Sequence, residues 1–214
     1  MSQLALTPDV ILRAYAAGIF PMSEARDDDD IFWVDPRRRG ILPLDAFHIS
    51  RSLKRRILRA DYGISVNAMF SDVVAACADR KDTWISARIF NLYEELHDAG
   101  FAHSLEVKRD NQLIGGVYGV TIGGAFFGES MFSRQTDGSK IALTYLVHRL
   151  RVGRFTLFDT QFITPHLESL GAIEIDRTVY HDMLDKALDV DADFFAQGAA
   201  PAPQDVIQRN GQTS

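Results

Sequence analysis

The sequence predicts an α+β fold, in which a small mixed N-terminal part precedes a mixed β-sheet flanked by helices. Three observations lead to this class. The first part of the chain mixes capped helical segments with short extended ones. From His103 onward, a hairpin pattern leads into a third strand, an amphipathic helix and a further strand. The 214 residues, of which 46% are hydrophobic, are enough to bury a sizeable core.

The first helix is predicted over residues 8–17. Thr7 offers a capping hydroxyl, Pro8 suits the first turn, and Gly18 is a natural end. Two short extended pieces follow, then a helix that Ser50 can cap, a strand, and two more helices. These elements are expected, in that order, at 31–34, 41–44, 51–60, 62–66, 70–78 and 87–100.

The second half of the chain is predicted to open with a β-hairpin. Residues 103–110 alternate in polarity, a DNQ turn follows, and residues 112–123 return. Residues 125–132 form a third strand. The helix over 139–152 then carries apolar residues at the spacing of one helical face, namely Leu143, Leu146, Val147 and Leu150. A strand, a short helix and a closing helix are expected at 156–162, 165–171 and 178–188.

Three regions are therefore expected along the chain. Residues 1–60 form an N-terminal α+β region that includes a basic helix, and residues 61–188 form the larger sheet domain. Residues 189–214 are expected to be a flexible tail, because their composition is rich in alanine, proline and polar residues.

Composition favours a cytoplasmic protein. Cys77 is the only cysteine, so no internal disulfide can form and a reducing compartment is expected. The first ten residues lack a basic segment followed by a long apolar run, so no signal peptide is expected. No stretch of the sequence approaches the ~20 apolar residues that span a bilayer, so no membrane partner is expected.

The net charge of −6 would by itself argue against a nucleic-acid partner, but the charges are segregated. An acidic run occupies 27–30 and a basic run 37–39. One face of the helix over 51–60 is basic and consists of Arg51, Lys54, Arg55 and Arg59. Such a face is either simply solvated or a surface that binds phosphates.

Glycines interrupt the strands of the hairpin and the strand after it. They are Gly115, Gly116, Gly119, Gly123, Gly124 and Gly128. Glycine weakens a strand and often marks a bulge or the close approach of another backbone or a ligand. The pattern therefore indicates either a twisted sheet or a strand against which a ligand packs.

Two polar clusters on these strands are candidates for chemistry. Glu129 is a lone carboxylate within an otherwise apolar, glycine-rich strand. Asp159 and Gln161 alternate with Phe158 and Phe162, which places the carboxylate and the amide on one face of the predicted strand. Such groups are costly to bury unless they are hydrogen-bonded, so they are either a solvated pair or part of a site.

Other site classes find little support. The stripe of Leu143, Leu146 and Leu150 is more typical of a core than of a pocket. His103, His148 and His166 are too scattered for a metal-ligand pattern, so no metal is expected. The sequence contains no Walker loop, GxGxxG or GxSxG motif. The residue patterns alone indicate a ligand-binding α+β domain.

A series of longer motifs resembles the leucyl/phenylalanyl-tRNA–protein transferase family over most of residues 5–188. The order and spacing of these motifs make the set specific. They are AYAAGIFPM, FHISRSLKRR, TWI at 83–85, GFAHSLEV, IGGVYGV, GESMFS, SKIAL, FDTQ and HLESLGA.

The resemblance implies an aminoacyltransferase that moves leucine or phenylalanine from leucyl-tRNA or phenylalanyl-tRNA onto acceptor proteins with N-terminal arginine or lysine. Methionyl-tRNA is a further expected donor. The acceptor would thereby be marked for N-degron-dependent proteolysis. The resemblance also implies that the sheet domain is catalytic and shaped like the Gcn5-related acetyltransferases, with no coenzyme A and no other cofactor.

The resemblance assigns residues by motif. It implies that Glu129 faces polar groups of the donor, and that Asp159 and Gln161 face the reacting centre. A pocket for the amino-acid side chain would be lined by Val117, Phe126, Leu143, Leu146, Leu150 and Phe158. The tRNA would be contacted by three aromatic side chains and the basic helix face, namely Tyr15, Trp84, Tyr93, Arg51, Arg55 and Arg59.

Two departures from the family pattern concern the path of the tRNA end. Met22 stands where the family typically has tryptophan, and FWVDPR replaces a longer WWSPDPR form.

Two alternative functions stay open, a coenzyme-A-dependent N-acyltransferase and a non-catalytic module that binds aminoacyl-tRNA. The segment SRQTDGS, with a single glycine, is a poor phosphate-cradling loop for the first, and the second would tolerate loss of Asp159.

Overall fold

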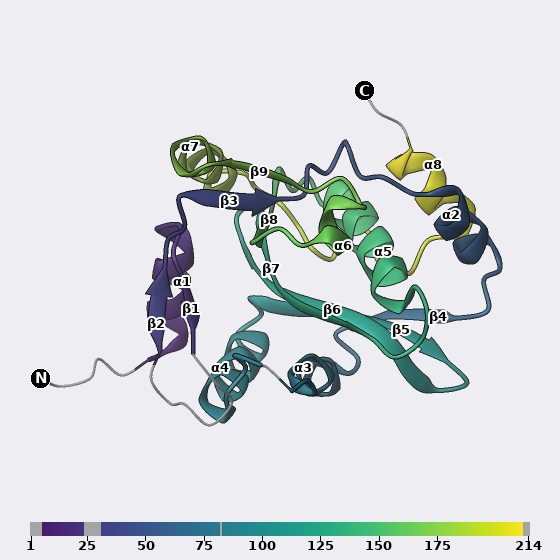
Figure 1. Cartoon of the computed structure of the whole chain (residues 1–214), viewed down its shortest axis with the longest axis horizontal. Coiled ribbons are helices and arrows are strands. Elements are labelled where there is room, and N and C mark those ends of the chain that lie inside the picture. The colour runs from purple at the N-terminus through teal and green to yellow at the C-terminus, as the bar shows by residue number, and fades with distance from the viewer. Residues whose placement is uncertain (1–5, 24–30, 82, 212–214) are drawn as a thin grey trace, which may run out of the picture.

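The computed structural model describes residues 6–23, 31–81 and 83–211, and it confirms the α+β class. A seven-stranded sheet has the strand order β4-β5-β6-β7-β8-β3-β9 (Figure 1). Within this sheet only β7 and β8 pair in parallel, and the other neighbours are antiparallel. The strands are β3 (Arg38–Ile41), β4 (Gly63–Val66), β5 (Ala102–Arg109), β6 (Gln112–Ile122), β7 (Ala125–Ser133), β8 (Leu157–Gln161) and β9 (Ile173–Asp176).

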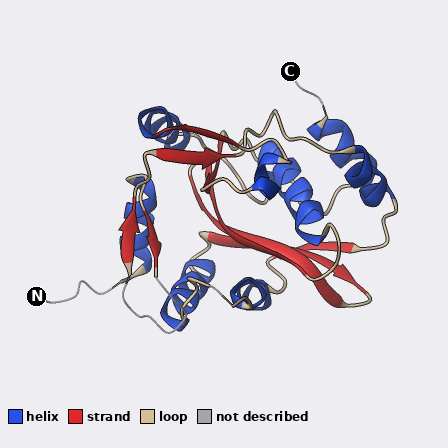
Figure 2. Ribbon diagram, in the orientation of Figure 1, coloured by secondary structure: helices blue, strands red, loops and turns tan. Residues whose placement is uncertain are grey.

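Helices cover both faces of the sheet, as Figure 2 shows. They are α1 (Pro8–Ala16), α2 (Arg51–Leu58), α3 (Phe70–Ala78), α4 (Ala87–Asp98), α5 (Gly138–Val152), α6 (Pro165–Glu168), α7 (Arg177–Leu188) and α8 (Pro203–Asn210). A separate antiparallel ribbon pairs β1 (Phe20–Met22) with β2 (Phe32–Val34). Among the described residues, no helix has the length and apolar character needed to cross a membrane.

The sheet separates two hydrophobic cores. One, the α4-side core, gathers buried residues of α1, α3, α4 and α7. The other, the α5-side core, gathers those of α2, α5 and α8. Because side chains alternate along a strand, Val117 of β6 belongs to the α5-side core and its neighbour Tyr118 to the α4-side core. The site described below lies where these two cores meet on β7 and β8.

Helix caps predicted from the sequence are present. The hydroxyls of Thr7, Ser50 and Ser86 accept hydrogen bonds from backbone N–H groups three residues later, at the starts of α1, α2 and α4. The helix stripe of α5 is buried, which confirms its assignment to a core. The acidic run at 27–30 lies outside the described residues.

Some elements differ from those expected. The extended piece expected at 41–44 lies earlier, because the strand β3 covers Arg38–Ile41 and uses the basic run as strand residues. Since β3 pairs with β8 and β9, the boundary expected near residue 60 does not separate the N-terminal region from the main sheet. The edge strand β9 was not expected, and its side chains are largely exposed.

The strand glycines make room for protein contacts. A Cβ atom on Gly115 would come within 2.4 Å of the Gly138 backbone, at the first turn of α5. A Cβ atom on Gly128 would lie 2.7 Å from the ring of Phe158 on the next strand. At these positions the twisted and closely packed sheet, and not an approaching ligand, accounts for the glycine.

The expectation of a flexible tail over 189–214 is wrong for residues 189–211. Phe194 and Val206 are buried in the α5-side core. The buried guanidinium of Arg149 on α5 donates from Nη1 to the carbonyl of Phe194 at 2.8 Å and from Nη2 to that of Gly198 at 3.1 Å. A few apolar residues spaced along a polar segment, together with one buried arginine, are enough to dock the tail.

We predict that Val206→Ala lowers the free energy of unfolding by about 2 kcal/mol, since it removes two buried methyl groups and leaves a cavity. Chemical denaturation measures this. Gln208→Ala, an exposed position of the same helix, is the matched control and should change stability little. Equal stabilities of the two variants would show that α8 is not docked in solution.

Candidate active site

A buried carboxylate on β7, Glu129, is the centre of the site, and it collects donors from three other elements. The hydroxyl of Tyr15 on α1 donates to Oε1 at 2.6 Å, and that of Tyr93 on α4 donates to Oε2 at 2.5 Å. Nε2 of Gln161 on β8 donates to Oε1 at 2.9 Å. We call these four residues the Glu129 cluster. The structure thus brings together four of the residues predicted from sequence.

The strands explain why a polar cluster can form inside this sheet. The parallel pairing of β7 with β8 covers only Ala125–Phe127 and Leu157–Asp159. Beyond this register, β8 ends at Gln161, whose φ of 62° is in the left-handed region. Where the ladder ends, side chains of the two strands can take up the space between them. Glu129 and Gln161 therefore meet through side-chain hydrogen bonding.

The environment of Glu129 changes its protonation. Burial raises the pKa of Glu129 to about 7, even though the hydrogen bonds from Tyr15, Tyr93 and Gln161 lower it. Burial also raises the pKa of both phenols well above the usual range, so both stay neutral donors. A carboxylate has about four acceptor sites, of which three are used here. Glu129 can therefore accept one further hydrogen bond from an amine.

Asp159 lies next to the Glu129 cluster but is turned into the protein. Both of its oxygens are held by the guanidinium of Arg39 on β3, at 2.9 Å from Nε and 2.6 Å from Nη2. Its side chain is 0% exposed and that of Arg39 is 1% exposed. The hydroxyl of Tyr180 donates to Oδ2 at 2.8 Å. The expectation that Asp159 faces the reacting centre therefore does not fit the structure, because its carboxylate is already fully engaged by protein groups.

A small cavity of about 70 Å³ opens beside Glu129, on the side of the α5-side core. Val117, Leu143 and Phe158 of the predicted side-chain pocket line it, together with Met131 and Leu167. The other predicted pocket residues, Phe126, Leu146 and Leu150, are buried in the same core but do not line the cavity. The cavity therefore joins an apolar wall to a carboxylate.

The aromatic residues predicted to contact tRNA lie on the other face of the sheet, in and around the α4-side core. Tyr15 and Tyr93 are fully buried, and their hydroxyls are 2.7 Å apart. The ring of Trp84 is partly buried and packs edge-on against Tyr93, with 6.5 Å between ring centroids. Trp84 therefore lies next to the Glu129 cluster through Tyr93, whereas the two tyrosines contact Glu129 through their hydroxyl groups.

The basic helix face is set apart from this cluster. Arg55 of α2 and Arg59, the residue that ends this helix, line a groove of about 770 Å³ with the residues of the β7–α5 connection. Five arginines and two aspartates line the groove, namely Arg55, Arg56, Arg59, Arg109, Arg134, Asp61 and Asp137. Arg51 is exposed on the first turn of the same helix and is not part of the lining. Arg109 and Arg134 were missed because only the fold places them opposite α2.

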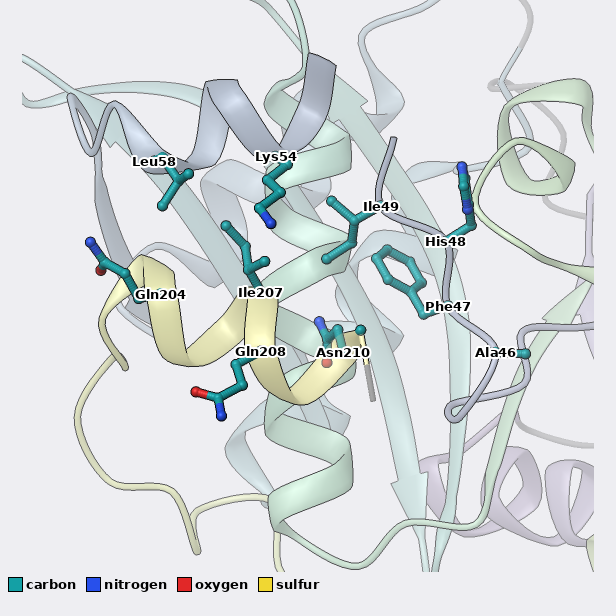
Figure 3. A pocket seen from close by; sticks show the side chains of 11 residues that line it. Ala46, Phe47, His48, Ile49, Lys54, Leu58, Gln204, Ile207, Gln208 and Asn210 are labelled. Carbon is teal, nitrogen blue, oxygen red and sulfur yellow. The ribbon is translucent and has the colours of Figure 1, made fainter. Parts of the chain in front are cut away.

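A second groove of about 770 Å³ lies between α2, α8 and the segment 46–49, as Figure 3 shows. Phe47, Lys54 and Ile207 are among the residues that line it. Lys54 belongs to the basic helix face, but no residue predicted for catalysis or for the side-chain pocket lines this groove. It therefore plays no part in the site built around Glu129.

Two partners of the site escaped the sequence analysis, Arg39 and Tyr180. Arg39 belongs to a run of three arginines, and nothing in that run distinguishes a buried guanidinium from two solvated ones. Strand alternation at 38–41 would have placed Arg38 and Arg39 on opposite faces, had the strand been recognised. Tyr180 carries no sequence signal beyond its place on a helix.

Comparison with known proteins places this arrangement in a class of aminoacyltransferases. The family model described as "Leucyl/phenylalanyl-tRNA protein transferase" matches residues 41–185, and the model of its N-terminal domain matches residues 5–37. The chain belongs to the leucyl/phenylalanyl-tRNA protein transferase family.

Relatives bearing this family name match along the whole chain. A leucyl/phenylalanyl-tRNA--protein transferase of Cereibacter sphaeroides is 64% identical over 214 residues, covering 100% of both chains. One of Ruegeria sp. is 61% identical over 211 residues, covering 99% of this chain and 100% of the relative.

Among solved structures, FemX is similar with a TM-score of 0.49 and 14% identity, over 72% of this chain and 60% of FemX. A GCN5-related N-acetyltransferase-like protein from Streptococcus suis gives 0.36 and 11%, over 78% and 64% of the respective chains.

We predict that Glu129 makes stability depend on pH between about 4.5 and 7. Its pKa is raised from an ordinary value of 4.5 to about 7, so the folded protein binds the proton more tightly than the unfolded chain. The stabilisation that the folded protein gains from this tighter proton binding is fully present below pH 4.5 and is lost as the pH rises to 7. The free energy of unfolding of the wild type, relative to Glu129→Gln, should fall by up to about 3 kcal/mol across this window. Urea denaturation at several pH values measures both proteins. Parallel stability curves would contradict the assignment.

Proposed function

We propose that the protein transfers leucine or phenylalanine from aminoacyl-tRNA to the N-terminal arginine or lysine of acceptor proteins, which marks them for proteolysis. Family membership over the full chain supports the donor class and the reaction. The observation that carries the proposal is the cavity that joins an apolar wall to the buried carboxylate of Glu129. An apolar amino-acid side chain and a nearby amine are the two groups that such a site suits.

The reaction needs little chemical assistance. The amine of the acceptor attacks the ester carbonyl of the aminoacyl-tRNA, an amide bond forms, and the ribose hydroxyl leaves with a proton. An N-terminal amine has a pKa of ~7.7–8.0, so on the order of a tenth is neutral at pH 7. Correct positioning of two such reactants corresponds to effective molarities of 10⁵ M or more, by order of magnitude. Positioning and electrostatics can therefore supply much of the rate.

We assign the roles within the site from the contacts. Glu129 accepts a hydrogen bond from the attacking amine of the acceptor and stabilises the positive charge that develops on its nitrogen. The amide nitrogen of Gln161 faces Glu129. Its carbonyl oxygen is therefore the acceptor that can orient the second amine, which is the α-amino group of the donor amino acid. Asp159 holds Gln161 in place and does not face the reacting centre, contrary to what the resemblance implied, because Arg39 and Tyr180 hold its carboxylate.

The cavity must widen to take an aromatic donor side chain. At about 70 Å³ it is smaller than the ~150 Å³ of a cavity that holds benzene, so a phenyl ring requires it to widen. Met131 lines the cavity, and an unbranched side chain with three rotatable bonds can move aside. Discrimination should be graded, because an apolar pocket separates neighbouring side chains by only ~1–3 kcal/mol per methylene.

We further propose that the groove of arginines beside α2 contacts the tRNA backbone. Arg134 is five residues beyond Glu129 on the same strand and loop, or about 17 Å at the strand rise of ~3.3 Å per residue. That separation corresponds to a few nucleotides between the aminoacyl ester and the first phosphates in the groove. Guanidinium groups suit this task, since they bind phosphate oxygens in a two-point geometry.

We predict transfer of leucine and phenylalanine, and also of methionine, from their tRNAs to a peptide that begins with arginine. Valine and isoleucine, which are branched at Cβ, should be transferred at least about 10-fold more slowly. The purified protein is mixed with each charged tRNA and the peptide, and the product is followed by mass spectrometry. A peptide that begins with alanine tests the acceptor, and acetyl-coenzyme A in place of tRNA tests the alternative acyl donor. Acetylation without aminoacyl transfer would overturn the proposal.

Reversal of one charge in the groove tests the tRNA contact. Arg55→Glu should raise the KM for leucyl-tRNA several-fold and reduce the slope of log KM against log salt by about 1, because fewer counterions are released. Lys186→Glu, an equal charge change at an exposed site on α7, is the control and should leave both unchanged. Transfer from an aminoacyl-adenosine, which lacks the tRNA phosphates, should be unaffected by either variant. An unaltered salt slope for Arg55→Glu would leave α2 as an ordinary solvated surface.

A further inference from the structure

The side chain of Arg39 is a buried connector between four parts of the fold. Its guanidinium lies between the rings of Phe20 and Tyr180, at 4.5 Å and 4.4 Å from their centroids. Nη1 donates to the carbonyl of Gly18, at the end of the turn after α1, at 3.1 Å. The guanidinium also makes the two hydrogen bonds to Asp159 on β8 and donates from Nη2 to the hydroxyl of Tyr180 at 3.3 Å. Arg39 therefore fixes β8 against α1, β1 and α7.

Stability alone does not account for such a group. Removing two charges from water is costly, and a buried ion pair is often no more stabilising than apolar residues of similar volume. The two-point contact does supply geometry, because the planar guanidinium holds both carboxylate oxygens in one plane. Stacking between two aromatic rings fixes that plane in turn. The orientation of the Asp159 carboxylate is thus set by Arg39.

That orientation reaches the active site through the backbone. Oδ1 of Asp159 accepts a hydrogen bond from the backbone N–H of Gln161 at 2.8 Å. Gln161 has a φ of 62°, a left-handed conformation that is unfavourable for a residue with a side chain. The bond from Asp159 stabilises this bend, and the bend directs the Gln161 amide to within 2.9 Å of Glu129. The contacts run without a gap from Arg39 to the Glu129 cluster.

We propose that Arg39 is a positioning residue for aminoacyl transfer, which acts by orienting Asp159 and thereby holding the bent Gln161 against Glu129. Arg39 touches neither substrate, since it is buried behind Asp159. The inference rests on the proposed function, because the reaction it serves is transfer onto an amine at Glu129 and Gln161. The position of Gln161 against Glu129 can also be checked without measuring transfer.

Arg39→Lys is the informative variant, because it keeps the charge and loses the two-point contact. The single-turnover rate at saturating leucyl-tRNA should fall ~10-fold or more, since misplacement by about 1 Å can cost as much as 10²-fold. The Kd for leucyl-tRNA should stay within about twofold of wild type, because the tRNA contacts are elsewhere. In a Gln161→Ala background, Arg39→Lys should cause little further loss, since both changes remove the same positioned amide. A wild-type transfer rate for Arg39→Lys would overturn the proposal. So would a loss of rate in the Gln161→Ala background as large as the loss that Arg39→Lys causes alone.

A second measurement does not depend on transfer. The hydrogen bond from Gln161 lowers the pKa of Glu129, and the charge of Asp159 raises it. Arg39→Lys should therefore raise the pKa of Glu129 in the same direction as Gln161→Ala, as followed by carboxyl-carbon NMR with Glu129→Gln for assignment. An unchanged pKa would show that Arg39 does not hold Gln161.

Two controls separate the possible failures. If Arg39→Lys does not fold, Asp159→Asn tests the same link, because it keeps the shape of the side chain while weakening the contact to Arg39. It should reproduce the loss of rate, and a folded variant that transfers at the wild-type rate would overturn the proposal. If the wild type shows no transfer at all, the proposed function fails, while the NMR titration still decides whether Arg39 positions Gln161.

Discussion

The burial of Glu129 is the constraint on which the site depends. A carboxylate inside a sheet is tolerated only when its oxygens are hydrogen-bonded, and here the donors come from α1, α4 and β8. The N-terminal helix is therefore tied to a strand that follows it by more than a hundred residues. Its position against the sheet is required by the hydrogen bond from Tyr15, as well as by apolar packing. Folding and assembly of the site are thus one event.

Strand alternation then divides the site into two halves. On β8, Phe158 points into the α5-side core and lines the apolar cavity, whereas Asp159 points toward Arg39 on the other side. The bend at Gln161 returns an amide to Glu129, where a regular strand would have continued the ladder. A pocket for an apolar side chain and a polar centre for an amine can therefore adjoin each other across a single strand. An ester bearing a leucine or phenylalanine side chain needs such a pair of surfaces.

Much of this could be predicted from the sequence, where the signal is local. Caps and periodicity placed the helices α1, α2 and α4, and alternation placed Asp159 and Gln161 on one strand. The direction of Asp159 could not be predicted, because its partner Arg39 is distant in the sequence and looks like its solvated neighbours. The tail was misjudged for a related reason. Its composition is that of a disordered segment, and Phe194 and Val206 dock only because α5 presents a core surface and Arg149.

The electrostatics of the molecule show how an acidic protein can present a surface to tRNA. At physiological ionic strength the Debye length is ~8 Å, so charges farther away contribute little at any exposed point. The net charge of −6 is therefore a poor guide to what a phosphate meets in the groove beside α2, where arginines outnumber carboxylates. Asp61 there binds both Arg56 and Arg109, which fixes two guanidinium groups in the groove at a small loss of positive charge.

The buried carboxylate of Glu129 responds to different influences. Glu129 is shielded from salt by protein, so its proton and its hydrogen bonds respond to the neighbouring groups Asp159, Gln161 and the two tyrosines. Salt should consequently act on tRNA binding and pH on the chemistry, because the groove is open to solvent whereas Glu129 is buried.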